Sequence, residues 1–206
     1  MRAQLETGID AVVKIVSRQH PGDKFPAERE IKLLRMFRDV GAQHICCIKD
    51  VRMTPTCSAM VVECMELGTV RDLLDTSPAE HTVRDPTVAG GVTRMRLRPL
   101  LHMCADVLAG LNAMHTHGLC HGGINPSNIG ATVIKTLGRV GYKILDLGVA
   151  VLPPLPPGVG APQRTPPAAS SCSNTTTALK NLRGSRLFMS PEQLDPQTMV
   201  SITLHW

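Results

Sequence analysis

The feature that most constrains this chain is a lysine inside a run of apolar, mostly β-branched residues. Ala11 to Val16 reads AVVKIV, and Lys14 stands near its centre. Such runs favour a buried strand. An ammonium group buried without a partner is costly. The fold must therefore bring an acidic side chain close to Lys14.

The helical pattern that follows supplies a suitable acid. Pro26 can open a helix over AEREIKLLRMFRDVG, and Gly41 can close it. Glu30 and Leu34 fall on one stripe of this helix, so Glu30 faces inward together with apolar residues. We therefore predict an ion pair between Lys14 and Glu30.

The remaining segments predict a mixed α+β chain. Strand-like stretches lie at 45–51 and 58–64, and the second leads through a hinge into a short helix. Residues 76–97 have no period and predict an exposed loop. A long helix follows between Pro99 and Gly118, and then two short strands, IGATVI and YKILDLG. The predicted buried stripe of the long helix comprises Leu101, Cys104, Leu108 and Leu111.

Composition narrows the class of protein. Only 2% of the 206 residues are aromatic against 43% hydrophobic, which predicts an aliphatic, Met-rich core. Seven cysteines without a C-x-x-C pair suit buried reduced thiols, so we expect a cytoplasmic protein. No signal peptide or membrane-spanning run is present, which predicts no membrane association. The net charge of +5 includes a short basic run at 94–98, but no aromatic residues interleave with it, so we expect no nucleic-acid partner.

Six motifs occur in a fixed order along the chain: AVVK, REIKLL, VVECMELGTVRDLL, HGGINPSN, DLG and GSRLFMSPEQL. Together they resemble the protein kinase domain. They match its V-A-I-K strand, helix C, gatekeeper strand and hinge, H-R-D-L-K-P-x-N catalytic loop, D-F-G motif and A-P-E segment. The resemblance covers Ala11 to Leu194 and favours the serine/threonine kinases.

The resemblance implies a protein-kinase-like bilobal fold that is incomplete at both ends. Residues 1–65 would form a partial N-lobe and hinge, without the first strand and the glycine loop. Residues 66–206 would form a partial C-lobe that ends after the P-E segment, with a long activation segment at about 147–192. Within that segment, residues 153–178 are rich in Pro, Ser and Thr, and we expect them to be disordered.

The resemblance also implies that the domain binds ATP and Mg²⁺. Lys14, held by Glu30, would contact the α- and β-phosphates. Asn128 and Asp146 would coordinate magnesium, because carboxylate and amide oxygens suit a hard cation.

The adenine would lie on the hinge, bonded to the backbone at Glu63 and Met65, with Val62 as gatekeeper. Val12 stands in its roof where the family usually has alanine, and Gly130 stands in its floor where the family usually has leucine. The roof is therefore expected to be larger and the floor smaller.

The catalytic loop departs from the family pattern at its reactive positions. Gly123 occupies the place of the catalytic aspartate, Gly122 that of an arginine and Asn125 that of a lysine, whereas His121 and Asn128 keep their places. Loss of a general base costs about 10²–10⁴-fold in rate. Three functions remain open: a pseudokinase-like binding module that acts through a protein partner, a weakly active serine/threonine kinase with protein substrates, and a non-functional kinase fragment.

Overall fold

A computed structural model describes most of the chain between residues 2 and 151, and a short segment beyond it. The described residues are 2–4, 10–17, 24–54, 57–76, 78–85, 87, 91–151 and 186–189. The expected disorder at 153–178 lies outside them, as does most of the predicted activation segment.

A four-stranded antiparallel sheet carries the lysine strand. Its order is β1 (Arg2–Gln4), β2 (Asp10–Ser17), β4 (Cys57–Glu63) and β3 (Ile48–Met53). In β2, Ala11 is the one buried residue, positions 12–14 and 16 are partly buried, and Ile15 is 59% exposed. The prediction of a buried strand is therefore wrong for most of β2, which is only partly covered.

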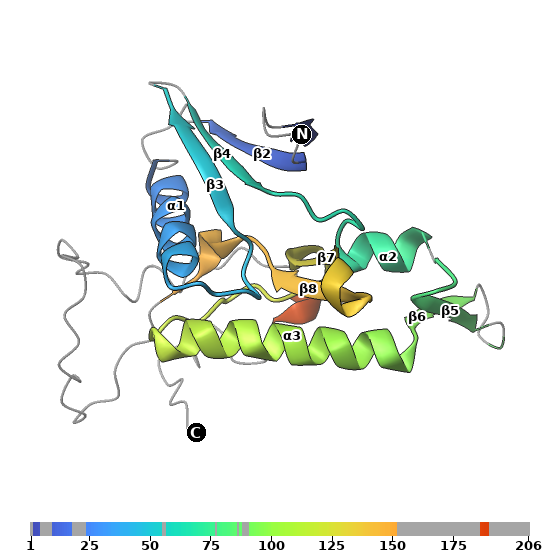
Figure 1. Ribbon diagram of the computed structural model, residues 1–206. Helices are drawn as coiled ribbons and strands as arrows, with labels where there is room; N and C mark the ends of the chain where they lie inside the picture. The colour runs from blue at the N-terminus through green and yellow to red at the C-terminus, as the bar shows by residue number, and fades with distance from the viewer. Residues whose placement is uncertain are drawn as a thin grey trace, which may run out of the picture.

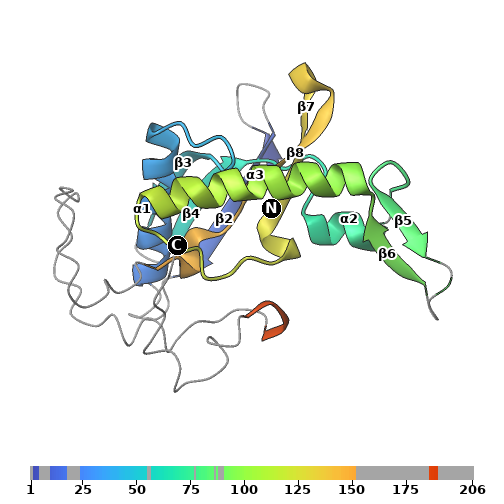
Figure 2. The same ribbon diagram turned by 90° about the horizontal axis from the view of Figure 1, so that it is seen from below.

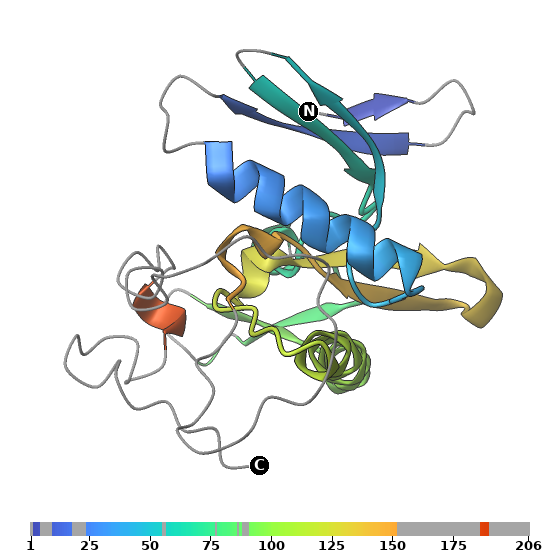
Figure 3. The same ribbon diagram turned by 90° about the vertical axis from the view of Figure 1, so that its left-hand side faces the viewer.

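Helix α1 (Lys24–Asp39) packs beneath this sheet, as Figure 3 shows. Its inward face buries Glu30 together with Ile31, Leu34 and Phe37. Gly41, with a φ of +70°, ends the helix, because glycine adopts this left-handed conformation without a Cβ clash. The predicted stripe and the predicted end of this helix are confirmed.

The second group of elements is built on α3 (Leu97–Thr116), which spans the molecule below α1 (Figures 1 and 2). The antiparallel pair β7 (Ile129–Ile134) and β8 (Arg139–Ile144) packs on α3, joined by a 3-10 turn. The shorter α2 (Val70–Thr76) lies beside β7.

The prediction of a loop at 76–97 is wrong. This region contains an antiparallel hairpin of β5 (Thr82–Asp85) and β6 (Val92–Met95). The short strands are held by backbone pairing along their whole length, which a search for hydrophobic period does not detect.

The predicted buried stripe of α3 is wrong for three of its four residues, and only Leu111 is partly buried against the core. Leu101 and Leu108 are 58% and 63% exposed, and Cys104 is exposed as well. The buried face instead contains Asp106, Val107, Gly110 and Met114. A Cβ at Gly110 would lie 2.8 Å from the carbonyl oxygen of His44, so the glycine permits a close backbone approach. Because Asp106 and Gly110 on the buried face are not hydrophobic, the pattern of apolar residues predicted a different face of α3 as the buried one.

One contiguous core joins the two groups of elements. It is largely aliphatic, with Met60 and Met114 fully buried, but Phe37 and Tyr142 are among its largest buried side chains. No described helix combines the length and the apolar character that spanning a bilayer requires. The described cysteines are all free thiols, yet only Cys46 is buried, and burial raises its pKa to about 12.

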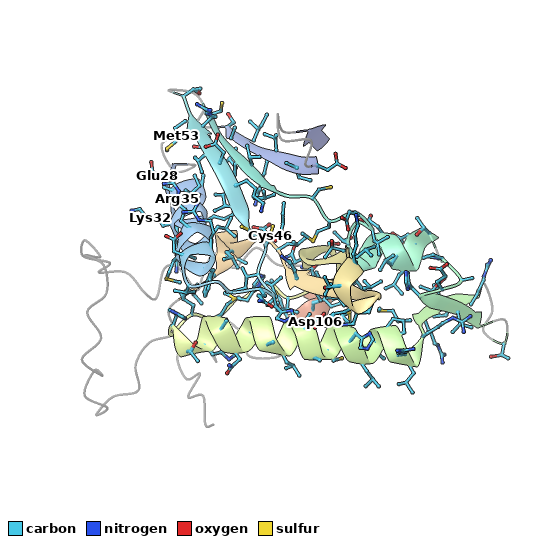
Figure 4. All side chains as sticks on the ribbon, in the orientation of Figure 1. Glu28, Lys32, Arg35, Cys46, Met53 and Asp106 are labelled. Carbon is cyan, nitrogen blue, oxygen red and sulfur yellow. The ribbon has the colours of Figure 1, made fainter. Side chains whose placement is uncertain are left out.

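The buried carboxylate of Asp106 ties α3 to β8 (Figure 4). It accepts hydrogen bonds at 2.8 and 3.0 Å from the Arg139 guanidinium and at 3.0 Å from the Tyr142 backbone N–H. Burial alone would raise the pKa of Asp106, but these donors outweigh burial and lower it. The ionised form therefore stabilises the fold.

We expect Asp106→Asn to lower the free energy of unfolding by about 3–5 kcal/mol, because it leaves the Arg139 charge poorly compensated. Asp75→Asn is the matched control, since Asp75 and Arg71 form an exposed helical pair worth about 0.3–0.5 kcal/mol. The Asp106 contribution is present above the unfolded pKa of about 3.9 and is lost as pH falls through the lower folded pKa. Urea denaturation at several pH values measures both effects. Equal losses for the two variants would contradict this role.

Candidate functional site

Lys14 lies between two carboxylates that come from distant parts of the chain. Its Nζ is 2.9 Å from both oxygens of Glu30 on α1 and 3.1 Å from Oδ1 of Asp146. Glu30 is buried, whereas the Lys14 and Asp146 side chains are 39% and 46% exposed. The predicted Lys14–Glu30 ion pair is confirmed, and Asp146 joins it as a second anion.

The charged groups in this cluster shift one another's pKa values. Burial alone would lower the pKa of Lys14, but Glu30 and Asp146 outweigh burial and raise it. The pKa of Glu30 is raised, because burial outweighs the attraction of the ammonium. Burial alone would raise the pKa of Asp146, but the Lys14 charge and hydrogen bonds lower it. Asp146 is thus the anion that stays ionised most readily, and it is also the more exposed.

Asp146 is positioned by an unusual backbone conformation. Its φ of +54° makes it the only described non-glycine residue with a positive φ. The 3-10 helix η4 (Leu147–Val149) begins directly after it, and its carboxylate accepts a hydrogen bond from the Gly148 N–H. A Cβ at Gly148 would lie 3.1 Å from Oδ1 of Asp146. A strained backbone of this kind persists only where the surroundings hold it, and it is typical of functional sites.

The imidazole of His121 supports the loop that follows α3. The ring is 2% exposed, with Nε2 3.0 Å from the Leu145 carbonyl and Nδ1 accepting a hydrogen bond from the Gly123 N–H at 3.1 Å. Nδ1 as acceptor requires Nε2 to carry the proton. Burial lowers the pKa of His121, which favours this neutral form. His121 therefore holds the backbone on both sides and is not available as a base.

Two asparagines converge on Gly123. The side-chain amides of Asn125 and Asn128 both donate to its carbonyl oxygen, at 3.1 and 2.8 Å. A Cβ at Gly123 would lie 2.8 Å from Cγ2 of Val149. The place where the family has its catalytic aspartate is thus closed by a neighbouring side chain.

Asn128 and Asp146 are neighbours through the backbone. The N–H of Leu145 donates to the Asn128 carbonyl at 2.9 Å, so Asp146 follows directly after a residue bonded to Asn128. Asn128 uses its Nδ2 to donate to the Gly123 carbonyl, so the amide oxygen of Asn128 remains as a ligand for a cation. These oxygens fit Mg²⁺, which is usually held by one or two protein groups together with phosphate and water. The described residues contain no cluster of three or more His, Cys, Asp or Glu side chains that could bind a metal.

The residues predicted around the adenine lie near the end of β4. Val12 and Val62 are cross-strand partners. The Met65 N–H makes no hydrogen bond within the described part of the chain, while its carbonyl accepts one from Gly68. A Cβ at Gly130 would overlap the Met65 side chain. The expectation of a smaller floor is therefore wrong, because Met65 fills the volume that a leucine would take.

The side chain of Glu63 has a role that the sequence interpretation missed. Its carboxylate accepts hydrogen bonds from Lys143 Nζ at 2.7 and 2.8 Å and from the Cys47 N–H at 2.6 Å. This pair connects the end of β4 to β8 and so spans the two groups of elements. Lys143, like Lys14, stands in an apolar strand and therefore needs an acidic partner. A search of the sequence for that partner could have pointed to Glu63.

We expect Lys14→Met to destabilise the fold at about pH 7 by roughly 1–3 kcal/mol, less than for a fully buried pair because Lys14 is 39% exposed. Glu30 then has a still higher folded pKa. The loss should therefore shrink as pH falls toward the unfolded value of about 4.3, where Glu30 binds a proton. Lys32→Met, on the exposed face of α1 (Figure 4), is the control. Thermal unfolding at several pH values tests this, and a loss that is independent of pH would count against it.

We also expect Gly123→Asp to lower stability by roughly 1–3 kcal/mol through overpacking against Val149. Val149→Ala removes the atom in the way. The double variant should therefore lose less stability than the sum of the two single variants. Chemical denaturation of all three proteins gives the coupling energy. Additive losses would mean that Val149 does not restrict this position.

Comparison with known proteins identifies the family. The comparison with curated proteins found no match. A family model described as the protein kinase domain matches residues 2–205, which is nearly the whole chain. Among the described residues, the order of strands and helices agrees with the order of the kinase-like motifs. The Lys14–Glu30 pair agrees with them as well. The chain belongs to the protein kinase domain family.

Proposed function

We propose that this protein is a kinase-family module that binds ATP with Mg²⁺, has lost most or all phosphotransfer, and acts through a protein partner. The observation that carries the proposal is a contrast within one site. The charged groups suited to a nucleotide are assembled around Lys14, while the position of the general base is a glycine.

The nucleotide part rests on groups whose charges complement those of phosphate and Mg²⁺. Lys14 is the cation for the α- and β-phosphates, and Glu30 orients it. Asp146 and Asn128 supply oxygens for Mg²⁺, which would neutralise the phosphates when bound. The Met65 N–H, unused within the described residues, is a donor for the adenine edge.

Two features favour weak binding. Asp146 already accepts bonds from Lys14 and from Gly148, so a metal must displace or share them. Met65 is only 8% exposed, and its side chain lies against Gly130 at the floor of the proposed adenine pocket.

The catalytic part rests on missing side chains. Gly123 has no side chain that could accept the proton of a substrate hydroxyl. Both ring nitrogens of the neighbouring His121 are engaged by backbone groups. Asn125 uses its amide on the Gly123 carbonyl and carries no charge for the transferring phosphate. Membership of the kinase family alone favours the second candidate, a weakly active serine/threonine kinase.

Calorimetric titration with ATP tests the nucleotide site. We expect weak binding that requires Mg²⁺ and falls by at least about tenfold in Asp146→Asn, because a metal ligand is lost. Asp50→Asn removes an exposed carboxylate on β3 and should bind as the unaltered protein does. Binding that is unaffected by Asp146→Asn would reject the proposed metal site.

A phosphotransfer assay on a mixed serine and threonine peptide library separates the two candidate functions. We expect incorporation no greater than that of the Lys14→Met variant. Incorporation above that background, with the same dependence on Mg²⁺, would favour the weakly active kinase instead.

A further inference from the structure

A cavity of about 500 Å³ lies at the N-terminal end of α3. Its walls come from the turn before β5, the first turns of α3, and the turn that joins β7 to β8. Figures 1 and 2 show these segments together at the end of the molecule opposite α1. None of the residues proposed to bind ATP lines this cavity. Its size lies within the range of about 300–1,000 Å³ that is typical of binding pockets.

The rim of the cavity is cationic. Arg96 and Arg98 line it, and Glu80 is the only acidic residue among the described residues of its walls. Within the described part of the chain, the Arg98 guanidinium has no ion pair or hydrogen bond. Arg96 uses only its Nε, which donates to the Ala79 carbonyl at 2.7 Å. A third lining arginine, Arg139, is already neutralised by Asp106. The charge available to a ligand therefore resides on Arg96 and Arg98.

Part of the cavity wall is apolar. It includes Leu67, Pro99, Val133 and Val140, and the Val133 side chain is 43% exposed. The backbone of this wall is fixed, because the Leu67 N–H donates to the Ala131 carbonyl at 3.1 Å and the Val133 N–H donates to the Glu66 carboxylate at 2.9 Å. These bonds do not require a bound ligand.

We propose that this cavity binds an acidic peptide segment of a protein partner. Carboxylates of the peptide would pair with the guanidinium of Arg98 and with the terminal N–H groups of Arg96 that Ala79 does not use. A guanidinium presents several donors in a planar fork. An apolar side chain between them would pack on Val133 and Val140. A nucleic acid fits less well, because the described residues that line the cavity include no Phe, Tyr or Trp for base stacking. The site is separate from the proposed nucleotide site and does not depend on it.

Fluorescence anisotropy with a short labelled peptide of alternating glutamate and leucine tests the proposal on the full chain. We expect saturable binding that weakens as salt is added. Arg98→Glu should weaken it by roughly tenfold or more, because a charge-assisted contact becomes a repulsion. Arg35→Glu makes the same charge change on the outer face of α1 (Figure 4) and should leave binding unchanged. Equal weakening by both variants would overturn the site, as would a lack of saturation.

Three further comparisons test the class of ligand. Val133→Ser should weaken the glutamate–leucine peptide but not a glutamate–serine peptide, which should itself bind less tightly. If the two peptides bind equally well, the apolar wall plays no part and the proposal fails. If a single-stranded oligonucleotide binds more tightly than the peptide, and this binding is lost in Arg98→Glu, the cavity is assigned to nucleic acid instead. Thermal unfolding of each variant verifies that the fold is intact.

Discussion

The contact of the Lys14 ammonium with two carboxylates joins three parts of the fold at the candidate functional site. Glu30 brings α1 against the sheet, and Asp146 brings the start of η4 to the same point. Burial of Glu30 costs free energy that only a nearby cation offsets. The position of α1, the register of β2 and the left-handed backbone at Asp146 all meet in this one interaction. A change in any of them leaves a charge without its partner.

The loop that resembles the kinase catalytic loop is held by bonds that do not need a catalytic side chain. His121 binds backbone on both sides, and Asn125 and Asn128 converge on the carbonyl of Gly123. A loop held in this way can keep the proposed nucleotide site in shape although position 123 is a glycine. This separation of scaffold from chemistry is the physical reason to propose binding without efficient phosphotransfer.

Charge and periodicity predicted part of the fold, while the other candidate site residues came from the resemblance to the protein kinase domain. A lysine in an apolar run and a glutamate on an apolar stripe, together with that resemblance, predicted the central ion pair, now observed at 2.9 Å. The same reasoning failed for α3, whose buried face holds Asp106 and Gly110. It also failed for the hairpin of β5 and β6, because backbone pairing between short strands leaves no hydrophobic period.

The sequence by itself determined the order of the elements other than β1 and the β5–β6 hairpin, the C-terminal ends of α1 and α3, and the absence of a side chain at Gly123. It also pointed to the pairing of Lys14 with Glu30. These depend on residue type and on short-range geometry. Only the tertiary structure decided that Met65 fills the space over Gly130, that Val149 closes the space beside Gly123, and that Glu63 pairs with Lys143 across the two groups of elements. It also brought Arg96 and Arg98 to the rim of a cavity with an apolar wall. Such contacts join residues far apart in the chain, and the packing of whole elements sets their distances.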